Sequence, residues 1–349
     1  MSNLTKTIEH FNWFYQQGPE SDIILSSQIG LVRNIQGYPF PHQMSDEQKN
    51  AALELIISMI KKSDLASQFD FYAMNELTTE EKDLIVERNI ASDALIQNLY
   101  SVIGIHKSKN LSLTLMDQDH LKISTIKGGL SLIDAYADCL YIDKSLEKLI
   151  QYAVSLKWGY QSSSLKDAGS GLQVSVLVHL PALEISSIIQ DTLKIIMDKG
   201  LLVKCYRGQG NSTLASLYQI SNKWSIGFNE NSFLDGFREL LIPLISLERK
   251  IRNALIEKKE SELRQKIERS REILKYSSSL SSQEAMELLS IIRLGVNMGF
   301  VEDHSLGQVT SLLFLSQKNQ IRNYPSQKDN QSTKINNDLM RAKLIRDIL

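Results

Sequence analysis

Four short segments hold the residue types that could bind a ligand or carry out chemistry. RGQGNS (207–212) is a glycine-rich turn beside an arginine, and such a turn can present backbone N–H groups to an anion. DQDH (117–120) supplies two carboxylates and a histidine, although a metal site needs more convergent ligands. KWGYQSSSLKDAGSGLQ (157–173) is a lid or a connector, and His179 is a core histidine or a ligand. Taken singly, each is also typical of an ordinary loop or core position.

The segment ILSSQIGLVRN (24–34) raises a more specific question. Its β-branched and aliphatic residues predict a buried strand. Because side chains alternate between the faces of a strand, Gln28 and Gly30 share one face and Ile29 lies on the other. A core does not need the glutamine, and a strand gains no packing from the glycine. We interpret this face as the remnant of a site that required particular residue types at both positions.

The elements that must position these residues mix strands and helices. Further strands are predicted over 111–117, 173–180 and 201–208. Amphipathic helices are predicted over 45–63, after the capping pair Thr78 and Glu81, and over 185–196 with Gly200 just beyond the end. Because the strands do not follow a regular strand–helix–strand repeat, the sequence predicts an α+β fold with an antiparallel or mixed sheet flanked by helices.

From about residue 233 the sequence reads as helical throughout. Helical periodicity and dense charge cover 233–275, Ser281 and Glu284 start a further helix, and a last helix closes the chain over 338–349. We therefore expect two domains, 1–232 and 233–349. The polar segment 324–337 is expected to be a mobile loop.

Length and composition describe an ordinary globular protein. The chain has 349 residues, of which 42% are hydrophobic and 23% charged, and its formal net charge is −1. This charge gives no electrostatic reason to expect binding to nucleic acid or to a membrane surface. Two cysteines, Cys139 and Cys205, favour a reducing compartment, and no signal peptide or apolar span of roughly 20 residues is recognisable. These features predict a cytoplasmic protein.

Taken in order, the segments resemble one family. SSQIGLVRN, YPFPHQM, DQDHLKI, KWGYQSSS, GSGLQVSVLVHLPAL, RGQG and LYQISNKWSIG are similar to the ATP:guanido phosphotransferases, and most of all to the bacterial protein arginine kinase (McsB-type) branch. The resemblance implies a guanido kinase catalytic fold over 1–232 and a helical domain for dimerisation and phosphoarginine binding over 233–349. It also implies transfer of the ATP γ-phosphate to a guanidinium nitrogen, with arginines clamping the phosphates and carboxylates orienting the guanidinium.

The positions match the family, but several residues do not. The family segment SSRIR reads SSQIG, so two phosphate-clamp arginines are replaced by Gln28 and Gly30. EEDHLR reads DQDHLK, which places Gln118 at the catalytic carboxylate and Lys122 at a third clamp arginine. GLRAS reads GLQVS, so a fourth clamp position holds Gln173. Three of these four clamp positions are neutral, and the lysine keeps the charge but not the two-pronged geometry.

The remaining family positions also differ. TSCPTN reads SSSLKD, with Ser164 at the cysteine position, and the histidine of VEKH is Asn89. The loop before YQISN is shortened and leaves the second catalytic glutamate without a clear equivalent. The degenerate catalytic positions are thus Gln118 and Ser164, and the degenerate nucleotide-binding positions are Ser26, Ser27, Gln28, Gly30, Asn89, Lys122, Gln173, Arg207 and Gly208.

The family motif RDxxRA, which binds phosphoarginine, appears here as NDLMRA, from Asn337 to Ala342. Asp338 and Arg341 are retained one helical turn apart, and the leading arginine is Asn337. Arg341 could hold a phosphate and Asp338 a guanidinium; alternatively, the two residues form an exposed ion pair on the helix.

These replacements predict a catalytically dead or impaired pseudokinase. Losing one donor to a transferring phosphoryl group costs about 10²–10³ in rate, and here nearly the whole set is replaced. We therefore expect a binding or adaptor protein of protein quality control, with no metal site and no cofactor, or with ATP and Mg²⁺ if activity remains. The resemblance implies a homodimer whose partners are a zinc-binding activator protein, a Clp-type chaperone and phosphoarginine proteins.

Two alternatives stay open at this point. In the first, the protein is an active protein arginine kinase with a rearranged site, in which Lys122, Lys166 and Arg207 act with the carboxylates Asp117, Asp119 and Asp167. In the second, the same cleft takes a different ligand, such as another phosphorylated metabolite.

Overall fold

The computed structural model describes residues 3–206, 213–227, 229–322 and 336–349. Eight antiparallel strands form one sheet in the order β2-β3-β4-β5-β1-β8-β10-β9. These strands are β1 (Ile24–Arg33), β2 (Phe69–Ala73), β3 (Val102–His106), β4 (Leu111–Leu115), β5 (Leu121–Gly128), β8 (Leu172–His179), β9 (Leu201–Cys205) and β10 (Leu217–Asn222). A separate hairpin pairs β6 (Val154–Ser155) with β7 (Gly159–Tyr160). The predicted α+β class, with an antiparallel sheet flanked by helices, is confirmed.

The first 200 residues contain the three predicted helices, of which the last begins at Ile189 and not at residue 185, together with further helices that the sequence analysis did not predict. They are α1 (Asn3–Ile8), α2 (Asp46–Lys62), α3 (Thr79–Glu87), α4 (Asp93–Gln97), α5 (Leu132–Glu147), α6 (Pro181–Ile185) and α7 (Ile189–Asp198), with short 3₁₀ turns η1 (Trp13–Tyr15) and η2 (Pro41–Gln43). Ser45 and Thr78 each form a complete capping box at the start of α2 and α3. Beyond α7, Gly200 has φ +88°, the left-handed conformation that suits a glycine after a helix end.

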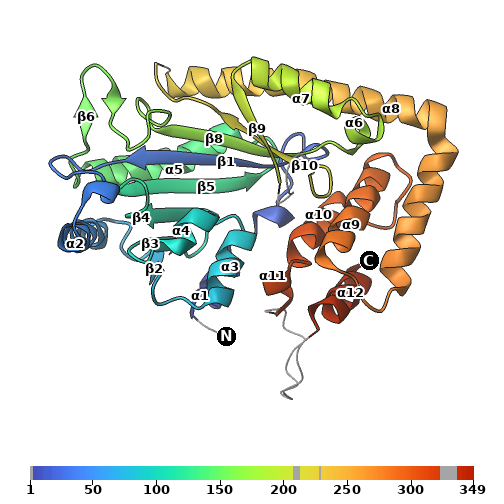
Figure 1. Ribbon diagram of the computed structural model, residues 1–349, viewed down its shortest axis with the longest axis horizontal. Helices are drawn as coiled ribbons and strands as arrows, with labels where there is room; N and C mark the ends of the chain where they lie inside the picture. Colours follow the sequence, from blue (N-terminus) through green and yellow to red (C-terminus); the bar gives the residue numbers. More distant parts are fainter. Residues whose placement is uncertain (1–2, 207–212, 228, 323–335) are drawn as a thin grey trace.

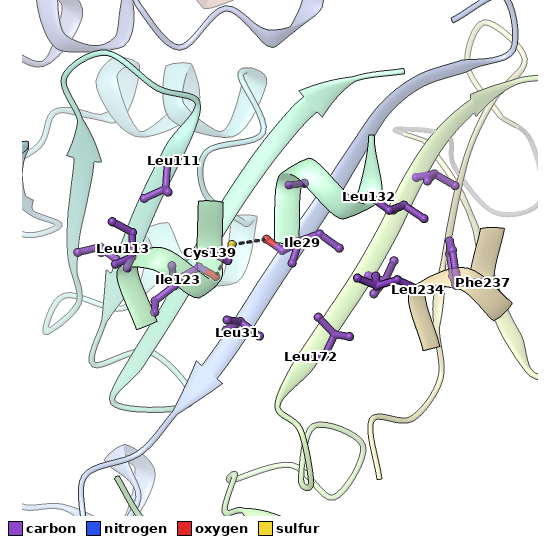
Figure 2. Packing of buried hydrophobic residues seen from close by; sticks show 14 of the residues in the cluster. Ile29, Leu31, Leu111, Leu113, Ile123, Leu132, Cys139, Leu172, Leu234 and Phe237 are labelled. Carbon is purple, nitrogen blue, oxygen red and sulfur yellow. Dashed lines mark hydrogen bonds between the residues drawn. The ribbon is translucent and has the colours of Figure 1, made fainter. Parts of the chain in front are cut away.

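The central strands pack against α5 and the start of α8 (Glu230–Tyr276). Figure 2 shows Ile29 and Leu31 of β1 meeting Cys139 and Leu132 of α5, with Phe237 of α8 at the far side of the cluster. Cys139 is fully buried and Cys205 is half-buried, and both are free thiols. Since this face of the sheet is filled by apolar side chains, any site on the central strands must lie on the opposite face.

The C-terminal third is helical, as predicted. It consists of α8, α9 (Ser282–Asn297), α10 (Leu306–Leu315), α11 (Lys318–Arg322) and α12 (Asn337–Ile348). In Figure 1, α8 runs along the sheet and then turns beside α9 and α12. Its backbone leaves helical geometry at Lys259, where φ is −140°. Because the first turns of α8 bury Leu234 and Phe237 in the core of the sheet, the predicted boundary at residue 232 lies at the start of a helix that serves both parts.

Two interfaces join the helical part to the rest of the chain. Arg293 of α9 is buried, donates to the carbonyls of Ser21 and Asp22, and donates to His179 Nδ1 of β8 at 2.8 Å. At the second interface, the buried Glu87 of α3 accepts hydrogen bonds from the backbone N–H groups that begin α11. Within the described ranges, no helix is both long and apolar enough to cross a membrane.

Candidate functional site

The face of β1 that carries Gln28 and Gly30 forms part of a cavity. Gly30 lies opposite Ser124 on β5 and opposite Gln173 on β8, while Ile29 is fully buried on the other face. The cavity measures about 190 Å³, and we call it the lysine cavity. Its lining residues are Gln28, Gly30, Lys122, Ser124, Lys166, Asp167, Gln173, Val174, Ser175, Leu202, Lys204, Gln219, Ser221 and Asn222.

Four positions that the resemblance assigns to clamp arginines come together here: Gln28, Gly30, Lys122 and Gln173 all line the lysine cavity. A Cβ atom at Gly30 would lie 3.0 Å from Lys122 Cε and 3.3 Å from Gln173 Oε1. The lysine and glutamine side chains therefore lie directly over the glycine. This grouping agrees with the match to the family motifs, while the nucleotide-binding role of these positions stays a prediction.

The charged groups of the lysine cavity are only partly compensated. Burial lowers the pKa of the Lys122 ammonium, and the carboxylates of Asp167 and Asp117 oppose this shift. Burial also raises the pKa of Asp167, against a hydrogen bond from Gln173 and the charges of Lys166 and Lys122. Lys166 Nζ is 4.0 Å from Asp167 Oδ2. Within the described part of the chain, Lys122 has no salt bridge or hydrogen bond, so its charge faces the cavity without a direct partner.

A second pocket contains the two positions that the resemblance assigns to catalysis. It measures about 390 Å³, and we call it the loop pocket. Gln118 and Ser164, which lie 46 positions apart in the sequence, both line it. The complete lining is Pro41, His42, Lys49, Asn98, Met116, Asp117, Gln118, Ser163 and Ser164.

Asp119 holds the two loops of this pocket together. Its buried carboxylate accepts hydrogen bonds from Asn34 Nδ2 at 2.6 Å, from Ser163 N at 2.8 Å and from Ser162 Oγ at 3.2 Å. These bonds join the end of β1, the loop after β4 and the segment that follows β7. Because its oxygens are engaged by protein donors, Asp119 orients the loops and leaves the pocket to its neighbours.

The neighbouring Asp117 is the carboxylate that lines the loop pocket beside Gln118. Burial raises its pKa, while hydrogen bonds from the Gln118 backbone and from Asn98, and the charge of Lys122, act in the opposite direction. Its position makes it the described carboxylate most available to accept a proton in this pocket. The sequence analysis included Asp117 only in the alternative of a rearranged site.

The two histidines raised by the sequence are neutral structural groups. Ile35 N donates to His120 Nδ1 at 3.0 Å, so Nε2–H donates to the Pro39 carbonyl at 3.0 Å. Burial lowers the pKa of His120 and, more strongly, that of His179, which also lies beside the guanidinium of Arg293. Among the residues that the structure describes, no group of three or more His, Cys, Asp or Glu side chains could hold a metal ion.

Other predicted nucleotide positions lie away from both pockets. Ser26 and Ser27 are buried, and Ser27 Oγ donates to the Gly129 carbonyl at 2.7 Å. Asn89 follows α3 with φ +58° and is absent from both linings. Arg207 and Gly208, like the turn 207–212 as a whole, lie outside the described residues.

The C-terminal motif adopts a geometry that the sequence did not indicate. The salt bridge between Arg341 and Asp338 forms at 2.5 Å, but the Arg341 side chain is only 2% exposed. Its guanidinium also donates to the carbonyls of Ser316 at 2.7 Å and Leu280 at 2.6 Å. The alternative of an exposed ion pair is therefore wrong for Arg341, which joins α12 to the ends of α10 and the α8–α9 loop. Asn337 Oδ1 accepts from Arg322, and Ala342 is fully buried.

Sequence reasoning missed residues that only tertiary structure adds to the pockets. Lys204 on β9 and Gln219 on β10 are register partners and both face the lysine cavity. For Lys204 the alternation within the predicted strand 201–208 was a usable signal, because it lies two residues from Leu202 on the same face. No strand was predicted around Gln219. Lys49 and Asn98 reach the loop pocket from α2 and from the end of α4, and no local pattern indicates this.

Comparison with known proteins agrees with this architecture. Residues 52–251 match the ATP:guanido phosphotransferase C-terminal catalytic domain, and residues 260–349 match the protein-arginine kinase McsB C-terminal domain. The two matches are separated by the part of α8 that contains the irregular Lys259. The predicted boundary at residue 232 is not tested by them.

Similar proteins cover nearly the whole chain. A protein-arginine kinase of Halothermothrix orenii is 31% identical over 98% of this chain and 97% of its own length. A protein-arginine kinase of Desulforamulus reducens is 32% identical over 87% of this chain and 86% of its own. Among solved structures, lombricine kinase has a TM-score of 0.58 at 18% identity and covers 68% of this chain and 69% of its own.

A duplicated taurocyamine kinase from Schistosoma mansoni has a TM-score of 0.60 at 21% identity, covering 67% of this chain and 34% of its own. At these identities the solved structures establish the fold alone. Together with the two matched domains and the near full-length relatives, they show that this chain belongs to the protein-arginine kinase family of ATP:guanido phosphotransferases.

Proposed function

We propose that this protein is a protein-arginine kinase homologue that has lost useful phosphoryl transfer and acts as a binding or adaptor protein in protein quality control. The observation that carries the proposal is the composition of the lysine cavity. At the four aligned clamp positions it presents two amides, a glycine and one lysine, namely Gln28, Gln173, Gly30 and Lys122. A phosphoryl group undergoing transfer needs several fixed cations around its oxygens, and a neutral amide does not supply that charge.

The expected loss follows from the number of groups replaced. Removal of one preorganised donor costs about 10²–10³ in rate, or about 2.7–4 kcal/mol. Gln118 adds a further loss, because an amide cannot accept the guanidinium proton as a carboxylate does. With the clamp and the proton acceptor both altered, we expect weak binding of the ATP triphosphate and no productive transfer.

The test is a transfer assay under native conditions. The purified protein is incubated with Mg–ATP and an arginine-rich protein, and acid-labile phosphoarginine is measured by mass spectrometry. The Halothermothrix orenii relative is the parallel reference. We expect no phosphoarginine above a no-enzyme blank, and no calorimetric binding of Mg–ATP at submillimolar concentration. Transfer that disappears in the Lys122→Met variant would overturn the proposal.

A second candidate is an active kinase with a rearranged site, favoured by the position of Asp117 in the loop pocket. In that case Asp117 replaces Gln118 as the proton acceptor, and Lys122, Lys166 and Arg207 bind the phosphates. Magnesium-dependent ATP binding that is abolished by Arg207→Ala, with transfer abolished by Asp117→Asn, would select this candidate. The control is Asp64→Asn, because Asp64 lies outside both linings.

The adaptor role would use the surfaces that the family provides. We propose a homodimer that contacts a zinc-binding activator protein and a Clp-type chaperone, and that binds phosphoarginine proteins through α12. Burial of Arg341 limits the part that this residue can take in phosphoarginine binding, because its guanidinium already has three protein acceptors. Calorimetry with phosphoarginine and with free arginine tests it, with Asp338→Asn as the variant expected to weaken binding if α12 takes part.

A further inference from the structure

The lysine cavity lies on a polar surface that spans five neighbouring strands. Residues two apart on β5, β1, β8, β10 and β9 point to the same face, so the polar positions of these strands meet side by side. The register places Gln28 opposite Ser175, Ser175 opposite Ser221 and Lys204 opposite Gln219. The result is a continuous field of amides and hydroxyls with lysines at its edges.

The charge of this field fits a small anion. Lys122, Lys166 and Lys204 face the cavity, and Asp167 is the acidic side chain in its lining. The Lys166 side chain is 53% exposed and lies at the limit of ion-pair distance from Asp167. A lysine binds phosphate as a point charge and lacks the planar fork with which arginine holds two oxygens. Lys122 and Lys166 lie together beside Asp167, whereas Lys204 lies on β9 at the far edge of the surface. Two neighbouring lysines suit a ligand with one phosphate better than a triphosphate.

The neutral groups indicate what else the ligand carries. Arginine and lysine only donate hydrogen bonds, whereas a glutamine amide and a serine hydroxyl both donate and accept. Gln219 Nε2 donates to Ser175 Oγ at 3.3 Å, which leaves the Gln219 carbonyl oxygen as an acceptor. A surface of this kind pairs well with hydroxyl groups, which likewise both donate and accept. Glutamine in place of a clamp arginine therefore changes which ligand the cavity prefers. It also weakens binding of the ATP triphosphate.

Size and shape restrict the ligand further. The cavity volume of about 190 Å³ is below the roughly 300–1,000 Å³ typical of pockets that enclose drug-sized ligands. Gly30 forms the floor, and a Cβ there would lie 3.0 Å from Lys122 Cε. The glycine is thus what lets the Lys122 side chain extend across the centre of β1. This gives the residue that looked unexplained in the sequence a direct structural consequence.

We propose that the lysine cavity binds a small, hydroxyl-rich molecule with a single phosphate, of the sugar monophosphate class. Lys122 and Lys166, which both lie beside Asp167, contact the phosphate, and the amides of Gln28, Gln173 and Gln219 contact the hydroxyls. The inference rests on the proposed function in one respect, since it requires that nucleotide no longer binds to this face of the sheet.

The test compares probes by calorimetry on the full chain at one ionic strength. The probes are glucose 6-phosphate, ribose 5-phosphate, glycerol 3-phosphate, glucose, inorganic phosphate and Mg–ATP. We expect at least one sugar monophosphate to bind at least tenfold more tightly than inorganic phosphate, glucose or Mg–ATP. Equal binding of inorganic phosphate, or no binding of any sugar monophosphate, overturns the inference.

Variants assign the binding to this cavity. Lys122→Met and Gln173→Leu are expected to weaken sugar-phosphate binding at least tenfold. Lys166→Met should do the same, and it provides a variant at an exposed position in case a more buried change affects folding. Lys199→Met, an exposed lysine outside the lining, is the matched control and should leave affinity unchanged. Undiminished binding in both Lys122→Met and Lys166→Met contradicts the assignment.

The outcomes also separate this inference from the proposed function. If Mg–ATP binds most tightly and phosphoarginine forms, the proposed function fails and this inference fails with it. If no transfer occurs and no sugar monophosphate binds, the proposed function stands and only the inference is overturned.

Discussion

At the scale of single residues, the absence of a side chain at Gly30 determines where its neighbours lie. With no side chain at position 30, Lys122 and Gln173 lie over the strand, and Gly30 forms the floor of the lysine cavity. Asp119 and His120 illustrate the opposite case. Both belong to the segment DQDH (117–120), whose residue types suggested a ligand or metal site. Both are buried and hydrogen-bonded to protein groups, where they hold loops in place.

Arg341 gives a prediction at this scale. Arg341→Ala removes the donor to two buried carbonyls, Ser316 O and Leu280 O, and each buried group left without a partner costs about 1–3 kcal/mol. We expect a loss of several kcal/mol in the free energy of unfolding, measured by urea denaturation. Lys343→Ala, an exposed lysine on the same helix, should change stability by less than about 0.5 kcal/mol. A loss confined to phosphoarginine affinity, without loss of stability, would contradict this structural role.

At the scale of elements, the contact between β8 and α9 joins the sheet to the helical part. His179 of β8 accepts from Arg293 and, through Nε2–H, donates to Ser290 Oγ at 2.7 Å. The lysine cavity uses the other end of the same strand, at Gln173 and Ser175. One strand, β8, therefore contributes both to the cavity and to the contact with the helical part.

The same contact predicts a pH dependence of stability. Burial and the nearby guanidiniums hold the pKa of His179 well below 6.5 in the folded state, so the folded protein keeps this histidine neutral. The unfolded chain takes up a proton near pH 6.5, so the His179 contribution is complete above that pH and is lost progressively as the pH falls below it. The slope from one group is at most about 1.4 kcal/mol per pH unit.

The variant His179→Gln keeps one acceptor and one donor but does not titrate. We expect its unfolding free energy, measured by urea titration between pH 5 and 8, to fall less steeply below pH 6.5 than that of the wild type. His106→Gln is the comparison, because burial also lowers the His106 pKa but its side-chain contact is with Gln68, away from the helical part. Only the change at His179 should alter amide hydrogen exchange in α9; equal exchange in both variants would contradict the proposed contact.

At the scale of the whole molecule, the two family domains share a core. One apolar cluster contains Trp13 and Phe14 of η1, Ile103 of β3 and Leu177 of β8, together with Leu289 of α9, Phe314 of α10 and Ile345 of α12. Trp13 packs edge-on against Phe314 with ring centroids 4.5 Å apart. Residues that belong to different matched domains are therefore buried in one cluster, and Figure 1 shows α9 and α10 beside the sheet.

This shared core predicts cooperative unfolding. Separate domains usually unfold in separate transitions, but here neither part can lose its structure without exposing apolar surface of the other. We expect one calorimetric transition, with the near-ultraviolet and far-ultraviolet circular dichroism changes coinciding. Phe314→Ala should lower the midpoint of that single transition, since truncating a buried Phe costs about 3–5 kcal/mol. Two resolved transitions, with Phe314→Ala shifting only one of them, would contradict a shared core.

The sequence by itself determined the local elements and the family. Ser45 and Thr78 encode the starts of their helices in adjacent residues, and the alternation around Ile29 encodes which face of β1 enters the core, because capping and alternation act over a few residues. Only the tertiary structure decided that Arg341 is buried, that Lys204 and Gln219 join Lys122 around one cavity, and that α8 serves two parts of the fold. These facts depend on which strands pair and which helices dock, and those contacts join residues far apart in the chain, where no local pattern records them.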